Sequence, residues 1–183
     1  MNKSWIANGF TAANALFGGL SIMMSISGEY HVAAICILFA MAADAFDGRV
    51  ARALGTAGPM GVELDSLSDD ISFGVAAGAL MYSYQLRELG ALGFIPCALL
   101  GAFCAFRLAR FNVKVTSVHG YFEGLPCPTV GVIIACYVLS GVKIWNWLAM
   151  VCVLALAVLM VSEVHYTHTK GDTADHHNLP ALL

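Results

Sequence analysis

Charged residues are scarce in this chain. Asp, Glu, Lys and Arg make up only 11% of its 183 residues, whereas 59% are hydrophobic and the mean hydropathy is +0.76. A typical soluble domain is about 25% charged. So few charges cannot cover the surface of a water-soluble globule, which excludes an ordinary soluble fold. The lipid bilayer is therefore the expected solvent.

Three features of other protein classes are also missing. No tract of Lys and Arg is present and the formal net charge is −3, so nucleic acid is not an expected partner. None of the six cysteines forms a C-x-x-C pair, and most lie in apolar runs, where cysteine acts as a small hydrophobe. The N-terminus lacks a small-residue cleavage site, so we expect the whole chain to be mature protein.

Long apolar runs fill most of the chain. A spanning helix needs about 20 mostly apolar residues, because backbone groups in lipid must be satisfied internally. Strict alternation of apolar and polar residues, typical of an outer-membrane barrel, is absent from the sequence. The sequence therefore predicts an all-α membrane protein, a bundle of six transmembrane helices at 9–27, 31–50, 66–84, 90–108, 127–142 and 145–163.

The basic residues are divided unequally between the two sides of this bundle. Two of them, Arg87 and Lys143, fall on one side, and the other side holds Lys3, Arg49, Arg52, Arg107, Arg110, Lys114 and Lys170. Cytoplasmic loops are enriched in Lys and Arg, so both termini and the connections 49–65 and 107–126 are expected in the cytosol. We expect a multi-pass protein of the cell membrane whose active-site cavity faces the cytosol.

The apolar runs and the short connections between them predict one transmembrane domain, 1–163, followed by a polar C-terminal tail, 164–183. The tail is rich in histidine. A solvated chain end is the expected interpretation, and metal binding is the alternative.

Half of the twelve acidic residues lie between positions 44 and 70, in and beside apolar helices. They are Asp44, Asp47, Glu63, Asp65, Asp69 and Asp70. An ionised carboxylate in a membrane helix costs about 2.5–3.5 kcal/mol or more and marks function by default. Repeating that cost within one short region requires a compensating cation.

Helical spacing places these acids in two rows. One row follows the i, i+3, i+4, i+7, i+8 pattern and consists of Asp44, Asp47, Gly48, Ala51 and Arg52. The other repeats every four residues and consists of Gly61, Asp65 and Asp69. Glycine and proline in the intervening segment, 55–61, turn the chain back, so the two rows are predicted to face each other at the cytosolic boundary.

Four clustered carboxylates predict a metal site. Unit charges about 4 Å apart repel by about 4 kcal/mol at an effective dielectric near 20. Two divalent ions would balance four aspartates, and oxygen ligands favour Mg²⁺ or Mn²⁺. Paired ions can bridge a pyrophosphate and assist in-line displacement. The structural alternative is ion pairing with Arg49 and Arg52, but two arginines cannot neutralise four to six acids.

These residues resemble the signature of the CDP-alcohol phosphotransferase family. Asp44-x-x-Asp47-Gly48-x-x-Ala51-Arg52, eight residues and Gly61-x-x-x-Asp65-x-x-x-Asp69 match it at every fixed position. Members of the family have six membrane helices, so the resemblance covers most of the chain. It implies that Asp44, Asp47, Asp65 and Asp69 hold two metals and that Asp69 is also the general base. It further implies a CDP site formed by Asn14, Asp44, Gly48, Ala51, Arg52 and Gly61.

Further motifs resemble the small phosphatidylserine synthases of this family. They are Glu63-Leu-Asp-Ser-Leu-Ser-Asp69 with Ser72-Phe-Gly-Val, Phe106-Arg-Leu-Ala-Arg-Phe-Asn112, Phe122-Glu-Gly-Leu-Pro-Cys-Pro128 and the opening Asn8-x-x-Thr11-x-x-Asn14. Capping of the first helix is the structural alternative for the opening. Asp70 departs from that branch, which usually has an apolar residue there. The resemblance implies a homodimer that transfers the lipid phosphatidyl group of CDP-diacylglycerol, or its CDP-archaeol counterpart, to L-serine and releases CMP.

A zwitterionic serine requires both a cation and an acceptor. Arg107 and Arg110, at the predicted cytosolic end of the fourth helix, could fork onto the serine carboxylate or a donor phosphate. Anchoring on lipid headgroups is the alternative for both arginines. Asn112 or Glu123 could accept from the serine ammonium group.

Other functions stay open on the residues alone. Glycerol 3-phosphate or inositol phosphate could be the acceptor, although their extra dianion requires a denser basic pocket. Membrane prenyltransferases also bind magnesium pyrophosphate through Asp motifs, but usually need a longer chain with two separated motifs. An ion-coupled transporter would use buried acids, yet tends to contain internal repeats, and none is visible in the sequence.

Overall fold

The structure is a computed structural model that describes residues 4–55, 58–114, 122–162 and 165–166. In that part, helices account for all regular structure except one antiparallel ladder of two residues per strand, which pairs β1 (Phe122–Glu123) with β2 (His165–Tyr166). The predicted all-α fold is confirmed. Most of the predicted tail, 164–183, lies outside the described residues, as do Lys3 and Lys170.

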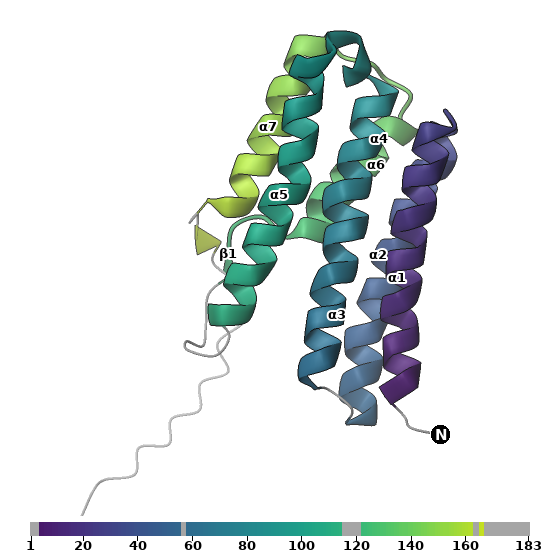
Figure 1. Cartoon of the computed structure of the whole chain (residues 1–183), viewed down its shortest axis with the longest axis vertical. Coiled ribbons are helices and arrows are strands. Elements are labelled where there is room, and N and C mark those ends of the chain that lie inside the picture. The colour runs from purple at the N-terminus through teal and green to yellow at the C-terminus, as the bar shows by residue number, and fades with distance from the viewer. Residues whose placement is uncertain (1–3, 56–57, 115–121, 163–164, 167–183) are drawn as a thin grey trace, which may run out of the picture.

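Seven α-helices run up and down the long axis of the described part (Figure 1). They are α1 (Ser4–Ile26), α2 (Tyr30–Leu54), α3 (Pro59–Asp69), α4 (Ala76–Tyr84), α5 (Ala91–Lys114), α6 (Cys127–Leu139) and α7 (Asn146–Val161). A π-helix, η1 (Asp70–Val75), joins α3 directly to α4, and a short 3-10 helix, η2 (Leu86–Leu89), leads into α5. The helix α1 packs along α2, α5 packs along α7, and η1 contacts α1, α5 and α6.

All six predicted spans coincide with helical segments, but they differ in length. Among the described residues, three helices are long and apolar enough to cross a membrane by themselves: Asn8–Ile26, Tyr30–Leu54 and Ala91–Val113. The third predicted span comprises α3, η1 and α4, while α6 and α7 are shorter apolar helices. At 1.5 Å per residue, α6 and α7 measure about 20 and 24 Å, less than the roughly 30 Å of a hydrocarbon core.

The third helical segment begins earlier than position 66, where hydropathy predicted its start. It begins at Pro59, after Gly58 in an extended conformation. Proline suits the first turn of a helix because its missing N–H would have no partner there. The helix α5 likewise extends past its predicted end at 108 to Lys114. Both boundaries were missed because the added turns contain charged residues, and both turns carry residues of the predicted site.

Close helix packing surrounds η1. A Cβ added to Gly74 would lie 2.9 Å from the Cβ of Cys104 and 3.1 Å from the Cα of Gly101 on α5. One added to Gly78 on α4 would overlap the backbone carbonyl of Cys97. Small residues allow membrane helices to approach this closely. Because these glycines have no side chain, η1 and α4 can pack directly against the backbone of α5.

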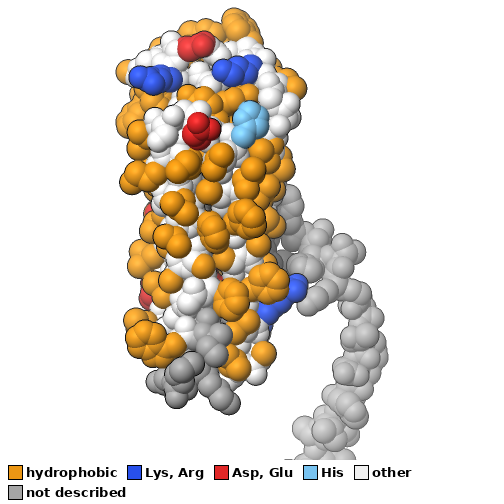
Figure 2. Space-filling model, turned by 90° about the vertical axis from the view of Figure 1, so that its right-hand side faces the viewer, with side chains coloured by type: hydrophobic (Ala, Val, Ile, Leu, Met, Phe, Trp, Pro, Cys, Tyr) orange, Lys and Arg blue, Asp and Glu red, His pale blue; other side chains and the backbone are white. Residues whose placement is uncertain are grey.

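Apolar side chains cover the outside of the molecule as well as its core. Leu16, Met23 and Phe39 expose 61%, 60% and 55% of their surface. Figure 2 shows the resulting hydrophobic band, with a group of charged side chains at the upper end of the visible face. Soluble monomers rarely expose continuous apolar patches of such extent. The long apolar helices and this surface make the chain a membrane protein.

A network of side-chain hydrogen bonds lies at the end of the molecule that contains η2. Buried Gln85 donates hydrogen bonds to the Ile144 carbonyl at 2.6 Å and to Asn146 Oδ1 at 3.0 Å. Its own oxygen accepts from the Tyr137 hydroxyl, and Asn146 donates to Glu88 at 2.6 Å. These bonds connect the end of α4 to α6 and α7. They lie at the opposite end of the third helical segment from Asp65 and Asp69.

Candidate active site

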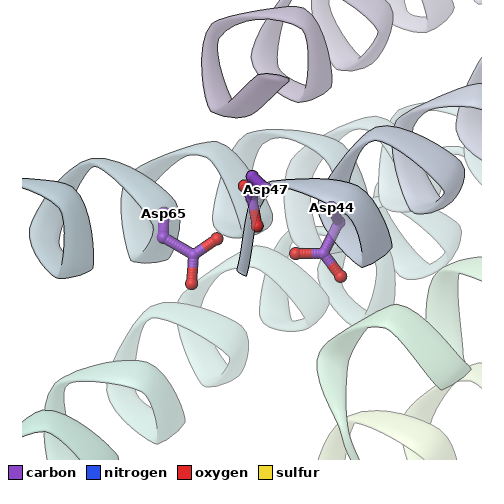
Figure 3. A group of neighbouring side chains, drawn as sticks. All are labelled: Asp44, Asp47 and Asp65. Atoms are coloured by element: carbon purple, nitrogen blue, oxygen red, sulfur yellow. The ribbon is translucent and has the colours of Figure 1, made fainter. Parts of the chain in front are cut away.

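Three aspartates from two helices meet between α2 and α3 (Figure 3). Asp44 and Asp47 lie one turn apart on α2, and Asp65 lies on α3. One carboxylate oxygen from each of the three falls within 4.8 Å of the others. The turn between α2 and α3 therefore brings the two predicted acidic rows together.

Asp69 joins this group from the last turn of α3. Its carboxyl group is in hydrogen-bonding contact with that of Asp44, and its Oδ1 accepts a bond of 2.9 Å from the Asn14 amide. Asp69 is 7% exposed and Asn14 is completely buried. All four predicted metal ligands thus form one cluster, to which α1 contributes a hydrogen-bond donor.

The helix α1 contacts the cluster at two further points. Thr11, one turn before Asn14, hydrogen bonds to the Asp47 carboxylate. The backbone carbonyl of Asn14 accepts a bond of 2.9 Å from the Ser72 hydroxyl on η1. The alternative that Asn14 caps the first helix is wrong, because α1 begins at Ser4. The side chain faces the acidic cluster from within the helix instead.

The donor set fits divalent cations. Asp47 Oδ2 and Asp65 Oδ1 are buried oxygens without a hydrogen-bond partner in the described part of the chain. A buried charged oxygen left without a partner is costly. No ion pair joins Arg49 or Arg52 to the cluster among the described residues, so the structural alternative based on those two arginines finds no support there. Carboxylate oxygens in this number suit Mg²⁺ or Mn²⁺.

A cavity of about 220 Å³ adjoins the cluster on the α5 side. Its polar lining consists of Asp65, Ser66, Asp69, Arg107 and Asn112. Its apolar lining consists of Val62, Leu108, Phe111 and Pro126. Two members of the acidic cluster therefore share this cavity with an arginine and an amide.

Hydrogen bonds across the cavity fix Asn112. The Asn112 amide donates to the Ser66 hydroxyl at 3.0 Å, and Ser66 in turn donates to the Val62 carbonyl at 3.0 Å. This bridge joins α3 to α5. Sequence patterns identified Asn112 but gave Ser66 no role, because residues 46 positions apart have no fixed spacing.

The two predicted serine-site arginines occupy different places. Arg107 lines the cavity, and its Nη1 donates to the sulfur of Cys127 at 3.8 Å. Its Nε is buried without a hydrogen-bond partner among the described residues. Arg110 donates to the carbonyl of Val161 at 3.4 Å, at the end of α7. Glu123 belongs to β1, and its side chain lies outside the described part of the structure.

The small residues predicted for nucleotide binding leave space around the cluster. A Cβ on Gly61 would find only Asn8 Oδ1, at 4.0 Å. One on Gly48 would contact the guanidinium of Arg52 at 3.7 Å. Arg52 is exposed and folds back along its own helix, whereas the side chain of Ala51 lies outside the described part. These glycines leave the backbones of α2 and α3 open to a ligand.

Comparison with known proteins accounts for this arrangement. Residues 4–162 match the family model of the CDP-alcohol phosphatidyltransferases. The chain belongs to this family. The resemblance stated from the aspartate signature is therefore confirmed over nearly the whole described structure.

Individual members of the family are similar along most of the chain. The CDP-diacylglycerol–serine O-phosphatidyltransferase of Helicobacter pylori is 35% identical over 170 residues, which are 89% of this chain and 72% of that protein. The enzyme of the same name from Bacillus subtilis is 34% identical over 166 residues, 90% of this chain and 91% of that protein. The archaetidylserine synthase of Methanothermobacter thermautotrophicus is 38% identical over 160 residues, 86% of this chain and 67% of that protein. These relatives confirm the resemblance to the members of the family that are named for serine as the acceptor.

Proposed function

We propose that this CDP-alcohol phosphatidyltransferase transfers the phosphatidyl or archaetidyl group of a CDP-linked lipid to L-serine and releases CMP. One observation carries the proposal: Asp69 belongs to the aspartate cluster and also lines the cavity that holds Arg107 and Asn112. A carboxylate in that position can meet the phosphates of one substrate and the hydroxyl of the other. The names of the relatives supply the two substrate classes.

Asp69 is the proposed general base. The serine hydroxyl is a poor nucleophile until its proton is removed, and Asp69 takes that proton as the oxygen bonds to the β-phosphorus. The bond from the β-phosphorus to the oxygen shared with the α-phosphate breaks, and CMP leaves with that oxygen. Asn14 orients the base through its bond to Oδ1. The transfer is direct, without a covalent enzyme intermediate.

The four aspartates Asp44, Asp47, Asp65 and Asp69 are the proposed ligands of two divalent cations, Mg²⁺ or Mn²⁺. When bound, such ions offset the charge of the pyrophosphate and of the leaving group. One oxygen each of Asp47 and Asp65 supports this assignment, because it is buried and has no hydrogen-bond partner among the described residues. The CDP group is assigned to the open backbone around Gly48 and Gly61, with Asn14, Asp44, Ala51 and Arg52 as its other contacts.

The cavity beside Asp69 is the proposed serine site. Arg107 provides the cation for the serine carboxylate, and the Asn112 oxygen is the acceptor for the ammonium group. Arg110 is assigned an outer supporting role, since it bonds to the end of α7, and Glu123 is the alternative acceptor for the ammonium group. Arg107 is the sole cationic side chain of the cavity among the described residues. A single cation favours serine over glycerol 3-phosphate or inositol phosphate, which carry an additional dianion.

The six helical segments are assigned to a bundle in the cell membrane, with residues 1–163 as its domain and the cavity open to the cytosol. Arg49, Arg52, Arg107 and Arg110 lie at the ends of α2 and α5 near the cluster, and Arg87 lies beyond α4 at the other end. This distribution supports cytosolic termini. A homodimer completes the proposed assembly.

The decisive experiment is transfer of labelled serine by purified protein in detergent. Labelled serine should enter lipid only when a CDP-lipid is added, and CMP should appear in equal amount. Glycerol 3-phosphate and inositol phosphate, supplied in parallel, should yield no lipid product. Incorporation of either phosphorylated alcohol in place of serine would refute the proposed acceptor, and no CDP-dependent product with any alcohol would refute the transferase itself.

A further inference from the structure

A buried row of polar groups lies behind Arg107. Arg107 Nη1 donates to Cys127 Sγ at 3.8 Å. Behind Cys127 lies the thiol of Cys104, and beside Cys104 lies the carboxyl group of Asp70. The row therefore runs from the cavity to η1 and connects α5, α6 and the residue that follows Asp69.

These contacts are set by close packing. Cys104 and Cys127 are both completely buried, and all six cysteines of the chain are free thiols. Cys104 faces Gly74: a Cβ added to Gly74 would lie 2.9 Å from the Cβ of Cys104. The two thiols consequently have little freedom to turn away from each other or from Arg107.

A thiol can both accept and donate a hydrogen bond. The sulfur of Cys127 accepts from Arg107 Nη1. The Cys104 thiol lies on the far side of Cys127 from the cavity. A short row of polar groups thus continues from the cavity into the packed interior.

Cys127 also provides the hydrogen-bond acceptor that the described residues show for the guanidinium of Arg107. Its sulfur is the hydrogen-bond partner of Arg107 among the described residues, and no carboxylate there forms an ion pair with this arginine. Fixing a long arginine side chain costs up to about 2 kcal/mol of rotamer freedom. A guanidinium that is held in place before the substrate binds has already lost that freedom. The entropic cost of substrate binding is therefore smaller.

We infer that Cys127 is a positioning residue that holds Arg107 at the edge of the cavity, with the buried Cys104 side chain packed behind it. The inference rests on the proposed function, in which Arg107 binds an oxyanion of a substrate. The oxyanion is the serine carboxylate if serine binding depends on Cys127, and a donor phosphate if CDP-lipid binding does. Asp70, the departure from the serine branch noted in the sequence, lies at the inner end of this row beside Cys104.

The test compares three variants of the full chain by steady-state kinetics with labelled serine and CDP-lipid. Cys127→Val keeps an apolar side chain but removes the hydrogen-bonding sulfur, and should raise the KM for serine by about tenfold with a smaller change in kcat. Cys127→Ser restores an acceptor and should return the KM to within about threefold of the wild-type value. Cys136→Val is the matched control, because Cys136 is an exposed thiol on the same helix, and its constants should equal those of the wild type.

The outcomes separate positioning from packing. An increase confined to the KM for CDP-lipid supports the same role with a donor phosphate as the bound group. Unchanged KM values in Cys127→Val overturn the inference, and so does an equal fall of kcat in the Val and Ser variants, which indicates packing alone. If Cys127→Val does not fold, Cys127→Ala is measured against the same criteria. Wild-type protein that does not use serine refutes the proposed function, a result distinct from all of these.

Discussion

Asn14 and Asp69, 55 positions apart in the chain, are joined by a hydrogen bond of 2.9 Å from the Asn14 amide to Asp69 Oδ1. Asn14 is completely buried, and its backbone carbonyl is bonded to Ser72. Both partners are therefore fixed, and the carboxylate proposed as the base is held by a helix outside the aspartate signature. The catalytic arrangement consequently depends on α1 as well as on α2 and α3.

Replacing Asn14 should lower activity without unfolding the protein. Asn14→Ala removes a hydrogen bond to a charged group, a contact worth about 1.5–3 kcal/mol, so kcat/KM should fall about tenfold or more. Ser21→Ala is the matched control. Ser21 is also buried on α1, but its hydroxyl has no hydrogen-bond partner within the described residues. Equal kinetics for Asn14→Ala and Ser21→Ala would remove Asn14 from the mechanism.

Removing the proposed base should affect chemistry more than donor binding. Asp69→Asn keeps the size of the side chain but cannot take a proton, so kcat should fall about 10²- to 10⁴-fold. Binding of CDP-lipid, measured by displacement of labelled CMP, should change much less. Glu63→Gln is the control, since Glu63 is an exposed acid on the same helix and should give wild-type kinetics. Normal turnover by Asp69→Asn would assign the base to another group.

Metal binding should stabilise the wild-type protein. A ligand present at about a hundred times its Kd adds about 2.7 kcal/mol, so Mn²⁺ or Mg²⁺ should raise Tm by about 5–10 °C. Asp47→Asn and Asp65→Asn remove charge at two cluster oxygens that are buried without a hydrogen-bond partner among the described residues, and should abolish most of that shift. Chelator should stop turnover by the wild type, and added Mn²⁺ or Mg²⁺ should restore it. Full activity in the presence of chelator would contradict the metal assignment.

Much of this site could be predicted from the sequence, because its parts are local. The four aspartates lie on two helices joined by a short turn, so helical spacing determines which side chains share a face. Six apolar segments were likewise visible as hydrophobic runs. Contacts between distant segments have no such pattern. The bonds from Asn14 to Asp69 and from Asn112 to Ser66 depend on how α1 and α5 pack against α3.

The π-helix η1 was missed for a related reason. Hydropathy does not distinguish a π-turn from an α-turn, since it sums over the same residues whichever way their side chains point. Contacts with other helices lie within η1: Ser72 bonds to α1, and Gly74 packs closely against α5. The start of α3 and the end of α5 were missed because helical turns that contain charged residues resemble loops in a hydropathy profile.

The two arginines of α5 should differ in their effects on serine use. Arg107 lines the cavity, whereas Arg110 bonds to the Val161 carbonyl. Lysine lacks the planar fork of arginine, so Arg107→Lys should raise the KM for serine by about tenfold while Arg110→Lys changes it little. Measurement of both constants with serine and CDP-lipid varied separately checks this. A larger effect of Arg110→Lys on serine would move the carboxylate site toward the end of α7.

A methyl group at Gly74 should destabilise the protein. The added Cβ would lie 2.9 Å from the Cβ of Cys104 and 3.1 Å from the Cα of Gly101, closer than side chains in a packed interior tolerate. Overpacking of this kind costs about 1–3 kcal/mol, so Gly74→Ala should lower Tm by about 3–10 °C. Gly19→Ala is the matched control, because nothing lies within 4 Å of a Cβ there and alanine favours a helix. Thermal unfolding of both variants in the same detergent makes the comparison. An equal Tm for the two would show that η1 can move away from α5, and the close contact at Gly74 would then have no part in holding Asp69 and Asp70 in place.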